Sequence, residues 1–481
     1  MVLGKRSRSP VEKKKELDDP SKWTVAKLKE WLEDEGLAAN GVKKTLVDRV
    51  VRAQKGEVDS EDEDEKDDFG ESEDDGDNFG DSSEEEDLPP PPVSKRSKRT
   101  LKTSFWTTHE SIIYLNAPES PDTGKIAAFD MDTTLVRPKS GKIHPQGRSD
   151  WVWMFEEVPS KLAQLHKDGY KIVIMSNQKG LSTGASRAQD IQGKIDDLAA
   201  DCKVPLCAIL ATEDDIYRKP SPAMFTFCAE NLITAPIDLK ESFYIGDAAG
   251  RPAGWAEGKK KDHGCSDRKF AVNAGVPFQT PEEYFLGEKA VEFSWLTINP
   301  TEIAVSTEQP FKSEALVSAE QEVIVFVGFP ASGKSTFAKT YLLPSGYVHV
   351  NRDTLGTPAK CLAATKAALA QGKSVVVDNT SPSKSVRESY IKAAQSASVP
   401  VRCFHFQTSL EIAQHMNSFR EVLTEGQQRH VPGVGFNTYK KHFEAPTTEE
   451  GFKEVKQIEF KRYHPDEHHR KLFEQWTERL R

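Results

Sequence analysis

The sequence predicts an α/β protein with two parallel-sheet domains, and three observations support this fold class. From about residue 101 onward, short apolar runs alternate with helical stretches; the clearest runs are KIAAFD, KIVIMSN, FYIGD, VIVFVG and SVVVD. Near-continuous apolar strands separated by helices indicate parallel sheets that are covered on both faces. Two such sets flank a less patterned stretch near residues 290–320, and a length of 481 residues also favours more than one domain.

The formal net charge of −10 is an average over segments that differ strongly. Much of the acidity lies between Glu57 and Asp87, where aliphatic residues are nearly absent, so we expect disorder there. The rest of the chain is basic overall, which keeps nucleic acid among the expected partners. The predicted divisions are a basic tail (1–19), a helical module (20–54), an acidic and proline-rich linker (55–100), a first α/β domain (101–290), an interdomain segment (291–320) and a second α/β domain (321–481).

The six cysteines form no CxxC pair, so we expect buried thiols in a reducing compartment. No run of about 18 uninterrupted apolar residues predicts a membrane span, and no apolar signal core is expected at the N-terminus. Two basic clusters, 5–8 and 95–99, are either nuclear-import signals or solvated linkers.

Residues 20–54 carry a two-helix pattern. Thr24 can cap the first helix, Gly36 can end it, and a second helix begins near Lys43. The stretch TVAKLKEWLEDEGLAANGVKKTLVDRVV resembles the SAP module, a small helical DNA-binding motif; a generic helical hairpin with a basic face is the alternative. The residues expected to face inward are Val25, Leu28, Leu32, Leu46, Val47, Val50 and Val51.

The segment FDMDTTLV places Asp130 and Asp132 directly after a buried strand. Residues i and i+2 of an extended segment lie on the same side, so both carboxylates can face one phosphate. One carboxylate can attack phosphorus while the other protonates the departing oxygen. Because both the carboxylate and the phosphate are anionic, Mg²⁺ is expected beside them. On this segment alone, turn-forming or helix-capping aspartates are the alternative.

Three later segments add four more polar side chains at strand ends or in loops. Ser176 and Asn177 end a strand and offer a hydroxyl and an amide to phosphate oxygens. Lys219 in YRKP can neutralise the phosphate charge. Asp247 in IGDAAGR ends another strand, as a hard Mg²⁺ ligand should.

The ordered set DxDxT, S-N, K and GD resembles the haloacid-dehalogenase (HAD) phosphatase superfamily, which has a Rossmann-like parallel sheet. Two longer segments, WVWMFEEVPSKLAQLHKDGYKIVIMSNQKG and GDAAGRPAGWAEGKKKDHGCSDRKFAVNAGVPFQTPEEYF, closely resemble the polynucleotide kinase 3′-phosphatase family. The roles that the resemblance implies are nucleophile for Asp130, acid/base for Asp132, phosphate binding for Ser176 and Lys219, and Mg²⁺ ligation for Asp130 and Asp247. Asp132 is kept as a further metal candidate. The resemblance also implies that Asp267 completes the acidic face, with an ion pair to Arg268 as the alternative.

Residues 328–335, GFPASGKS, fit the pattern GxxxxGK[ST], follow the apolar strand VIVFV and precede a helical stretch. In such a loop the backbone N–H groups wrap nucleotide phosphates, Lys334 reaches the β and γ oxygens, and Ser335 can hold Mg²⁺. We therefore predict a P-loop kinase domain with ATP as the phosphate donor. The nucleotide-binding candidates are Gly328, Ser332, Gly333, Lys334, Ser335 and Thr336.

Two aspartates and two arginines are further candidates for the kinase reaction. Asp353 in NRD could accept the proton of an attacking hydroxyl, or it could be a helix N-cap. Asp378 ends the strand VVVD, where it could contact Mg²⁺, a water or the acceptor substrate. GFPASGKST, HVNRDTLG and VVVDNT occur in the order of the kinase half of the same family, which implies that Asp353 is the general base. The family pattern HxxxFRE implies that Arg420 neutralises the migrating phosphate; a solvent-facing arginine is the alternative, and Arg429 is a second candidate.

Animal members of this family begin with a forkhead-associated phosphopeptide-binding domain, whereas this chain has the SAP-like segment. We therefore expect direct, salt-dependent tethering to DNA. The sequence predicts a monomeric nuclear enzyme that hydrolyses 3′-phosphates and phosphorylates 5′-hydroxyls at DNA strand breaks. An RNA-end-healing enzyme, a scaffold with decayed sites and a fused metabolite phosphatase and kinase are the alternatives. The histidines His464, His468 and His469 are expected on a solvated terminal helix.

Overall fold

The computed structural model of the chain describes residues 106–305 and 316–478 and seven N-terminal residues: Pro20, Leu28, Trp31, Leu32, Val47, Val50 and Val51. The chain divides into two units, 1–97 and 98–481. The expectations for the basic tail, the acidic linker and the two basic clusters lie outside the described residues.

A seven-stranded sheet forms the centre of the first domain, in the order β1-β2-β7-β6-β3-β8-β9. Five neighbouring strands of this sheet are parallel, as predicted: β7, β6, β3, β8 and β9. β1 and β2 add an antiparallel pair at one edge, which the apolar pattern did not indicate because three of the four residues of β1 are exposed. The strands are β1 (Trp106–His109), β2 (Ile112–Leu115), β3 (Ile126–Phe129), β6 (Lys171–Asn177), β7 (Cys207–Ala211), β8 (Phe243–Ile245) and β9 (Phe278–Gln279).

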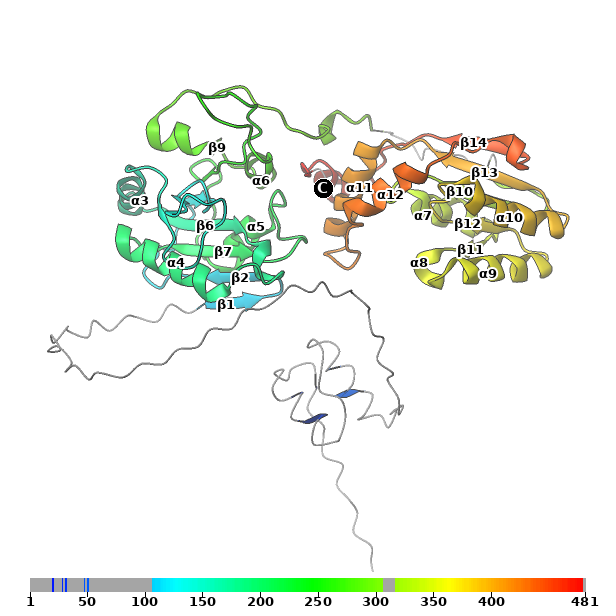
Figure 1. Cartoon of the computed structure of the whole chain (residues 1–481), viewed down its shortest axis with the longest axis horizontal. Coiled ribbons are helices and arrows are strands. Elements are labelled where there is room, and N and C mark those ends of the chain that lie inside the picture. Colours follow the sequence, from blue (N-terminus) through cyan, green and yellow to red (C-terminus); the bar gives the residue numbers. More distant parts are fainter. Residues whose placement is uncertain are drawn as a thin grey trace, which may run out of the picture. The chain divides into compact units, whose positions relative to one another are not determined.

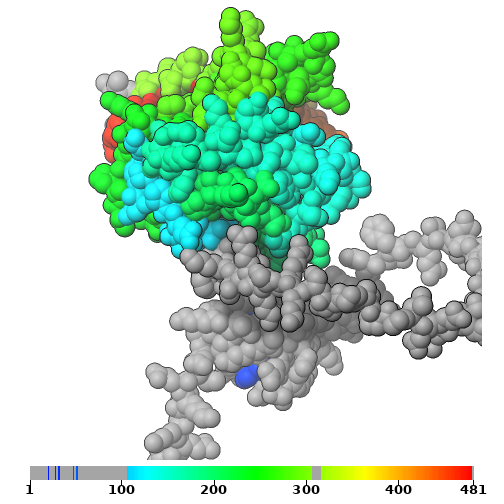
Figure 2. Space-filling model, turned by 90° about the vertical axis from the view of Figure 1, so that its left-hand side faces the viewer, coloured from blue at the N-terminus to red at the C-terminus, as the bar shows by residue number. Residues whose placement is uncertain are grey.

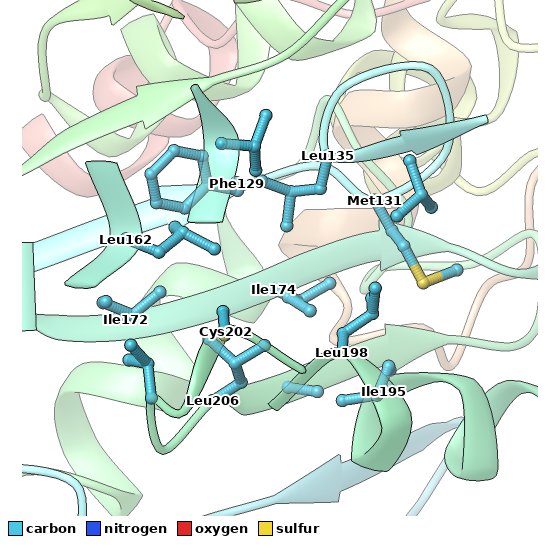
Figure 3. Packing of buried hydrophobic residues seen from close by; sticks show 14 of the residues in the cluster. Phe129, Met131, Leu135, Leu162, Ile172, Ile174, Ile195, Leu198, Cys202 and Leu206 are labelled. Atoms are coloured by element: carbon cyan, nitrogen blue, oxygen red, sulfur yellow. The ribbon is translucent and has the colours of Figure 1, made fainter. Parts of the chain in front are cut away.

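Helices cover both faces of this sheet (Figure 1). Successive residues of β3 point to opposite faces: Phe129 packs with α3 and α4 in the cluster of Figure 3, whereas Ala128 packs on the side of α5 and α6. Both faces of β3 are buried, which is why the strand reads as a continuous apolar run. The helices are α3 (Val158–Lys167), α4 (Ala188–Cys202), α5 (Ala223–Asn231) and α6 (Ser266–Ala274), with short turns η2 (Lys179–Leu181), η3 (Glu282–Leu286) and η4 (Pro300–Glu302).

Between β3 and α3 in the chain, β4 (Val136–Arg137) and β5 (Val152–Trp153) form a small antiparallel pair. The loop that joins the two strands contacts α4, because the Arg148 guanidinium pairs with Asp197 at 2.5 Å. Within the loop, the Asp150 carboxylate accepts hydrogen bonds from Ser140 and Gln146. The space-filling view shows the surface of the first domain, coloured cyan to green (Figure 2).

The second domain contains a five-stranded parallel sheet in the order β11-β12-β10-β13-β14. α9 and α10 pack on one face, and α7 with η6 on the other. The strands are β10 (Val323–Val327), β11 (Val348–Val350), β12 (Val375–Val377), β13 (Val401–Phe406) and β14 (Glu454–Ile458). The helices and turns are α7 (Lys334–Phe337), η6 (Ala338–Leu342), η7 (Leu343–Ser345), α8 (Arg352–Leu355), α9 (Pro358–Ala370), α10 (Lys384–Ser396), α11 (Leu410–Leu423), α12 (Gly433–His442), η8 (Thr448–Glu450) and α13 (Glu467–Phe473).

The segment after α13 packs on α6 of the first domain. The Trp476 ring stacks on Trp295 with ring centroids 4.1 Å apart. Asn273 exchanges two hydrogen bonds with the main chain of Trp476, and the buried Lys269 ammonium donates to Thr477 O at 2.8 Å. These contacts join the two α/β domains within the unit 98–481.

In the N-terminal unit, Leu28, Leu32 and Val50 are fully buried together, with Trp31 and Val47 packed against them. These positions agree with the predicted inward face, whereas Val25 and Leu46 lie outside the described residues. All six cysteines are buried and free, as expected. Within the described part of the chain, every helix is too short or too polar to span a bilayer.

Candidate active sites

The carboxyl ends of neighbouring strands gather three aspartates in the first domain. Asp130 follows β3 and Asp247 follows β8, and the Asp130 N–H donates to Ile245 O at 2.9 Å across this strand pair. Asp267 comes from the first turn of α6. One carboxylate oxygen from each of the three aspartates lies within 4.8 Å of the other two. The structure therefore brings Asp130 and Asp247 together as predicted, and it adds Asp267.

Lys219 contacts two of these three aspartates. Its ammonium is 2.7 Å from Asp130 Oδ1 and 2.7 Å from Asp267 Oδ1. It also donates to the hydroxyl of the buried Tyr244, which in turn donates to Met175 O at 3.0 Å. Tyr244 was not among the predicted site residues, because within FYIGD it looks like one more apolar strand residue.

Burial and mutual repulsion make the carboxylates hard to ionise together. Burial raises the pKa of Asp130 to about 6; Lys219 opposes this shift, and the charge of Asp267 adds to it. Burial also raises the pKa of Asp247 well above its ordinary value, with the charges of Asp267 and Asp130 adding. A single ammonium cannot neutralise three carboxylates, so a divalent cation that prefers oxygen ligands, such as Mg²⁺, fits this group.

Asp267 is held toward the site rather than toward its neighbour in sequence. Its Oδ2 accepts a hydrogen bond from Ala248 N at 2.9 Å. Arg268 instead donates to Ala249 O and lies over the Phe293 ring, 3.7 Å from the centroid. The alternative of an Asp267–Arg268 ion pair is therefore wrong.

The remaining predicted residues of this site lie on and beside β6. Asp132 is half-exposed, and its Oδ2 accepts from Gln178 Nε2 at 2.8 Å. The same Gln178 amide donates to Ser176 Oγ at 3.1 Å. Asn177 was predicted to bind phosphate, but its side-chain amide bonds the main chain of Lys219 through both its oxygen and its nitrogen. We therefore assign Asn177 a positioning role.

The phosphate-binding loop of the second domain runs from β10 to α7, as predicted. Gly328 has no room for a side chain, since a Cβ there would lie 2.9 Å from Phe406 Cβ. Gly333 has φ of +88°, which favours glycine, and it precedes the first helical residue, Lys334. The exposed Ser335 and Thr336 follow in the first turn of α7.

Lys334 is buried in this loop. Its ammonium donates to Gly328 O at 3.1 Å and to Ser332 Oγ at 3.0 Å, and it also contacts Phe329 O. Burial lowers the pKa of Lys334 to about 8, although the charges of Asp378 and Asp353 oppose the shift. The ammonium therefore lies within the electrostatic reach of both acidic candidates.

Asp378 ends β12 and is buried beside the loop. His349 Nε2 lies 2.9 Å from its Oδ2, and Asn351 Nδ2 donates to the same oxygen at 3.1 Å. Burial would raise the pKa of Asp378, but the side chains of His349 and Ser335 and the charge of Lys334 together lower it. Its Oδ1 is buried and has no hydrogen-bond partner among the described residues, so an anionic oxygen beside Ser335 remains for a Mg²⁺ ion.

Asp353 is not a helix N-cap and Arg420 is not a fully solvent-facing arginine, which were the alternatives for these two residues. Asn351 is the N-cap of α8 and accepts from Asp353 N at 2.8 Å, so Asp353 is not the cap. Arg420 is half-buried on α11 and donates to Asn417 Oδ1 at 3.1 Å. Its Nε is buried with no partner in the described part of the chain. Burial lowers the pKa of Arg420, with the charge of Asp353 opposing.

Arg429 and the C-terminal histidines were also singled out in the sequence. Arg429 is exposed, and its guanidinium lies 3.9 Å from a carboxylate oxygen of Glu213. His468 and His469 are on the terminal helix α13, as expected, and His469 pairs with the N-cap residue Asp466 at 2.8 Å. The prediction is wrong for His464, which precedes this helix and accepts a hydrogen bond from Arg462 Nε at 2.7 Å.

Comparison with known protein families divides the chain in the same order. Residues 125–285 match the family described as polynucleotide kinase 3 phosphatase, residues 323–446 match an AAA domain, and residues 19–55 match the SAP domain. The SAP match favours that reading of the N-terminal module over a generic helical hairpin.

Curated relatives match both α/β domains together. A bifunctional polynucleotide phosphatase/kinase of Schizosaccharomyces pombe is 37% identical over 356 residues, which cover 74% of this chain and 85% of the relative. A putative protein of the same description from Acanthamoeba polyphaga mimivirus is 33% identical over 389 residues, covering 75% and 91%. A solved D,D-heptose 1,7-bisphosphate phosphatase from B. bronchiseptica, complexed with magnesium and phosphate, is 16% identical with a TM-score of 0.26 and covers 35% of this chain and 88% of that one.

Proposed function

This chain belongs to the bifunctional polynucleotide phosphatase/kinase family, and from that premise we propose that it converts broken DNA ends into ligatable ones. Its first domain hydrolyses 3′-phosphate ends and its second transfers the γ-phosphate of ATP to 5′-hydroxyl ends. The observation that carries the proposal is the grouping of Asp130, Asp247 and Asp267 around Lys219, because this arrangement suits an enzyme that must bring a carboxylate up to a phosphate.

In the phosphatase reaction, a carboxylate oxygen of Asp130 attacks phosphorus and the P–O3′ bond breaks. Asp132 gives its proton to the departing 3′-oxygen, and an aspartyl-phosphate forms on Asp130. Water then attacks this phosphorus, Asp132 takes a proton from the water, and the bond between phosphorus and the Asp130 oxygen breaks. Inorganic phosphate leaves and the Asp130 carboxylate is regenerated. Lys219 and the hydroxyl of Ser176 neutralise and bind the phosphate oxygens. Mg²⁺ held by Asp130, Asp247 and Asp267 would supply the charge compensation that lets two anions meet. Asp132 was also a metal candidate, but its carboxylate is not part of this group, and we propose the acid/base role for it alone.

In the kinase reaction, the loop from Gly328 to Ser335 holds the phosphates of ATP, with Lys334 on the β and γ oxygens. Asp353 accepts the proton of the attacking 5′-hydroxyl, and the oxygen forms a bond to the γ-phosphorus as the bond to ADP breaks. The buried, unpaired Nε of Arg420 supports its role as a donor to the migrating phosphate. When bound, Mg²⁺ beside Ser335 and Asp378 would neutralise phosphate charge.

The SAP domain suggests that the protein binds DNA, and we propose that it tethers the enzyme near strand breaks. Lysine and arginine contacts with the phosphate backbone would make this tethering sensitive to salt and tolerant of sequence. We further propose that the enzyme acts in the nucleus, on the basis of the basic clusters at 5–8 and 95–99, and that it is a monomer. A fluorescent fusion that stays outside the nucleus, or a dimeric mass in solution, would remove the corresponding part of the proposal.

The central test is product analysis on a nicked duplex that carries both a 3′-phosphate and a 5′-hydroxyl. With ATP and Mg²⁺ we expect a 3′-hydroxyl and a 5′-phosphate, which a ligase then seals. A matched nick in an RNA strand measures the preference for DNA. Failure to change either end of the DNA nick would overturn the proposed function.

A further inference from the structure

A second lysine lies beside the site of the first domain, and it has no role in the mechanism above. Lys194 is on α4, and only 4% of its side chain is exposed. Its ammonium is 3.7 Å from Oδ1 of Asp132. Burial of an ammonium is costly unless a charge or hydrogen bonds compensate it. The partner of this ammonium is the Asp132 carboxylate, and the Asp132 side chain is itself 44% exposed.

The surroundings of Lys194 hold it in place. Arg148 from the loop between β4 and β5 lies directly over Gly193, where a Cβ would be only 2.6 Å from Arg148 Cδ. The Arg148 guanidinium is fixed in turn by its ion pair with Asp197, one turn further along α4. The charge of Lys194 also acts on Asp150 of the same loop. The low exposure of Lys194 shows that its stem is covered, and its ammonium lies on the side of the Asp132 carboxylate.

Each carboxylate oxygen of Asp132 has a polar partner. Gln178 Nε2 donates to Oδ2 at 2.8 Å, while Lys194 lies on the side of Oδ1. A general acid must stand within hydrogen-bond reach of the departing oxygen, and a misplacement of about 1 Å can cost about 100-fold in rate. A half-exposed aspartate has few packing contacts to fix it, so polar partners must do so.

We infer that Lys194 is a positioning residue that holds Asp132 for transfer of its proton to the departing 3′-oxygen. This inference rests on the proposed phosphatase function. In the step concerned, the P–O3′ bond breaks, its electron pair goes to the 3′-oxygen, and the Asp132 proton binds that oxygen. An ester whose leaving group is already a stable anion does not need this proton, so it does not need Lys194.

The test compares two phosphate esters in the full-length protein with Mg²⁺. A 3′-phosphorylated oligonucleotide releases an alkoxide-type oxygen, whereas p-nitrophenyl phosphate releases a stable phenolate. We compare kcat/KM because it reports the steps up to the first irreversible cleavage. For Lys194→Met, kcat/KM should fall about 10- to 100-fold on the oligonucleotide and less than about threefold on the aryl ester. The fall on the oligonucleotide is a part of the rate acceleration of about 10²–10⁴-fold that a general acid contributes.

Lys171→Met is the matched control. Lys171 is another buried lysine of the same domain and lies on β6. Its ammonium donates to Asn116 and Ser120 and not to an aspartate. We expect its substitution to change both esters by the same factor. Lys194→Gln is the second variant, and the comparison is made with whichever Lys194 variant melts within about 5 °C of the wild type.

Two outcomes would overturn the inference: an equal fall on both esters in the folded Lys194 variant, or no fall on either. Asp132→Asn separates this failure from failure of the mechanism. If the wild type removes 3′-phosphate and Asp132→Asn shows the expected preference for the aryl ester, only the role of Lys194 is lost. If Asp132→Asn shows no such preference, the proposed acid/base role itself is wrong.

Discussion

Asn177 holds the main chain of Lys219 by two hydrogen bonds. Its Oδ1 accepts from Lys219 N at 2.9 Å, and its Nδ2 donates to Lys219 O at 3.3 Å. The loop that carries Lys219 is thereby fixed to the end of β6, one residue beyond Ser176. This arrangement fixes the main chain of Lys219 relative to the carboxyl end of β6.

We predict that Asn177→Ala lowers the phosphatase kcat about 10- to 100-fold, because Lys219 would no longer be held within its narrow productive range. The loss of two part-buried hydrogen bonds should cost about 1–3 kcal/mol of stability. Steady-state kinetics and thermal melting measure the two effects. Kinase activity of the same variant is the internal control, and a phosphatase kcat equal to that of the wild type would contradict the positioning role.

Single substitutions should separate the two reactions. Asp130→Ala removes the attacking carboxylate, so 3′-phosphate removal should disappear while 5′-phosphorylation continues. Lys334→Ala removes the ammonium from the phosphate-binding loop and should do the reverse. Both activities can be followed on one nicked duplex with labelled ATP. Loss of both activities from either folded variant would contradict two independent sites.

Arg420→Lys should lower the kinase kcat strongly, although it conserves charge. The Nε of Arg420 is a buried donor without a partner among the described residues, and lysine has no equivalent atom. We expect a fall of about 10³-fold, as for other arginines that stabilise a migrating phosphate. Arg429→Lys is the matched control, since the Arg429 side chain is 83% exposed. A similar fall in both variants would argue for a general charge effect instead.

His415 should make the second domain sensitive to acid. Burial lowers the pKa of His415 to about 4 from an ordinary value of 6.5. Above pH 6.5 the histidine is neutral in both states and does not change the free energy of unfolding. As the pH falls from 6.5 toward 4, the unfolded chain binds the proton more readily than the folded one, so the free energy of unfolding falls. The difference amounts to about 2 kcal/mol at pH 5.

This pH dependence can be isolated with His415→Gln, whose amide does not titrate and can still donate to Phe473 O as the His415 ring does. Urea unfolding at pH 7 and pH 5 should show a drop in stability that is about 2 kcal/mol larger for the wild type than for the variant. Equal drops in the two proteins would show that His415 is not the group responsible.

Deletion of residues 1–100 should leave both chemical activities intact and weaken retention on DNA. The SAP domain match covers residues 19–55, whereas both catalytic groups lie beyond residue 125. Binding to an undamaged duplex should weaken, and its dependence on salt should become less steep. Affinity and salt slope are measurable by fluorescence anisotropy, and unchanged values would remove the tethering proposal.

The parallel sheets and the two phosphate sites could be predicted because each depends on local sequence. Buried parallel strands are continuous apolar runs, and their carboxyl ends carry Asp130 and Asp247 in the first domain and Asp378 in the second. The roles of Tyr244 and Lys194 could not be predicted in this way. A tyrosine in a strand and a lysine in a helix are common, and only packing brings their polar ends to the aspartates. The use of Asn177 likewise depends on where the distant Lys219 loop lies.

The contact between α6 and the segment after α13 has a consequence for how the protein is made. Asn273 and Trp476 are 203 residues apart in the chain, so the first domain leaves the ribosome long before its partner segment has been synthesised. Until then, the Trp295 ring and the buried Lys269 lack the groups that cover them. Nascent or prematurely terminated chains should therefore present this patch to chaperones and proteases, which links survival of the first domain to completion of the second.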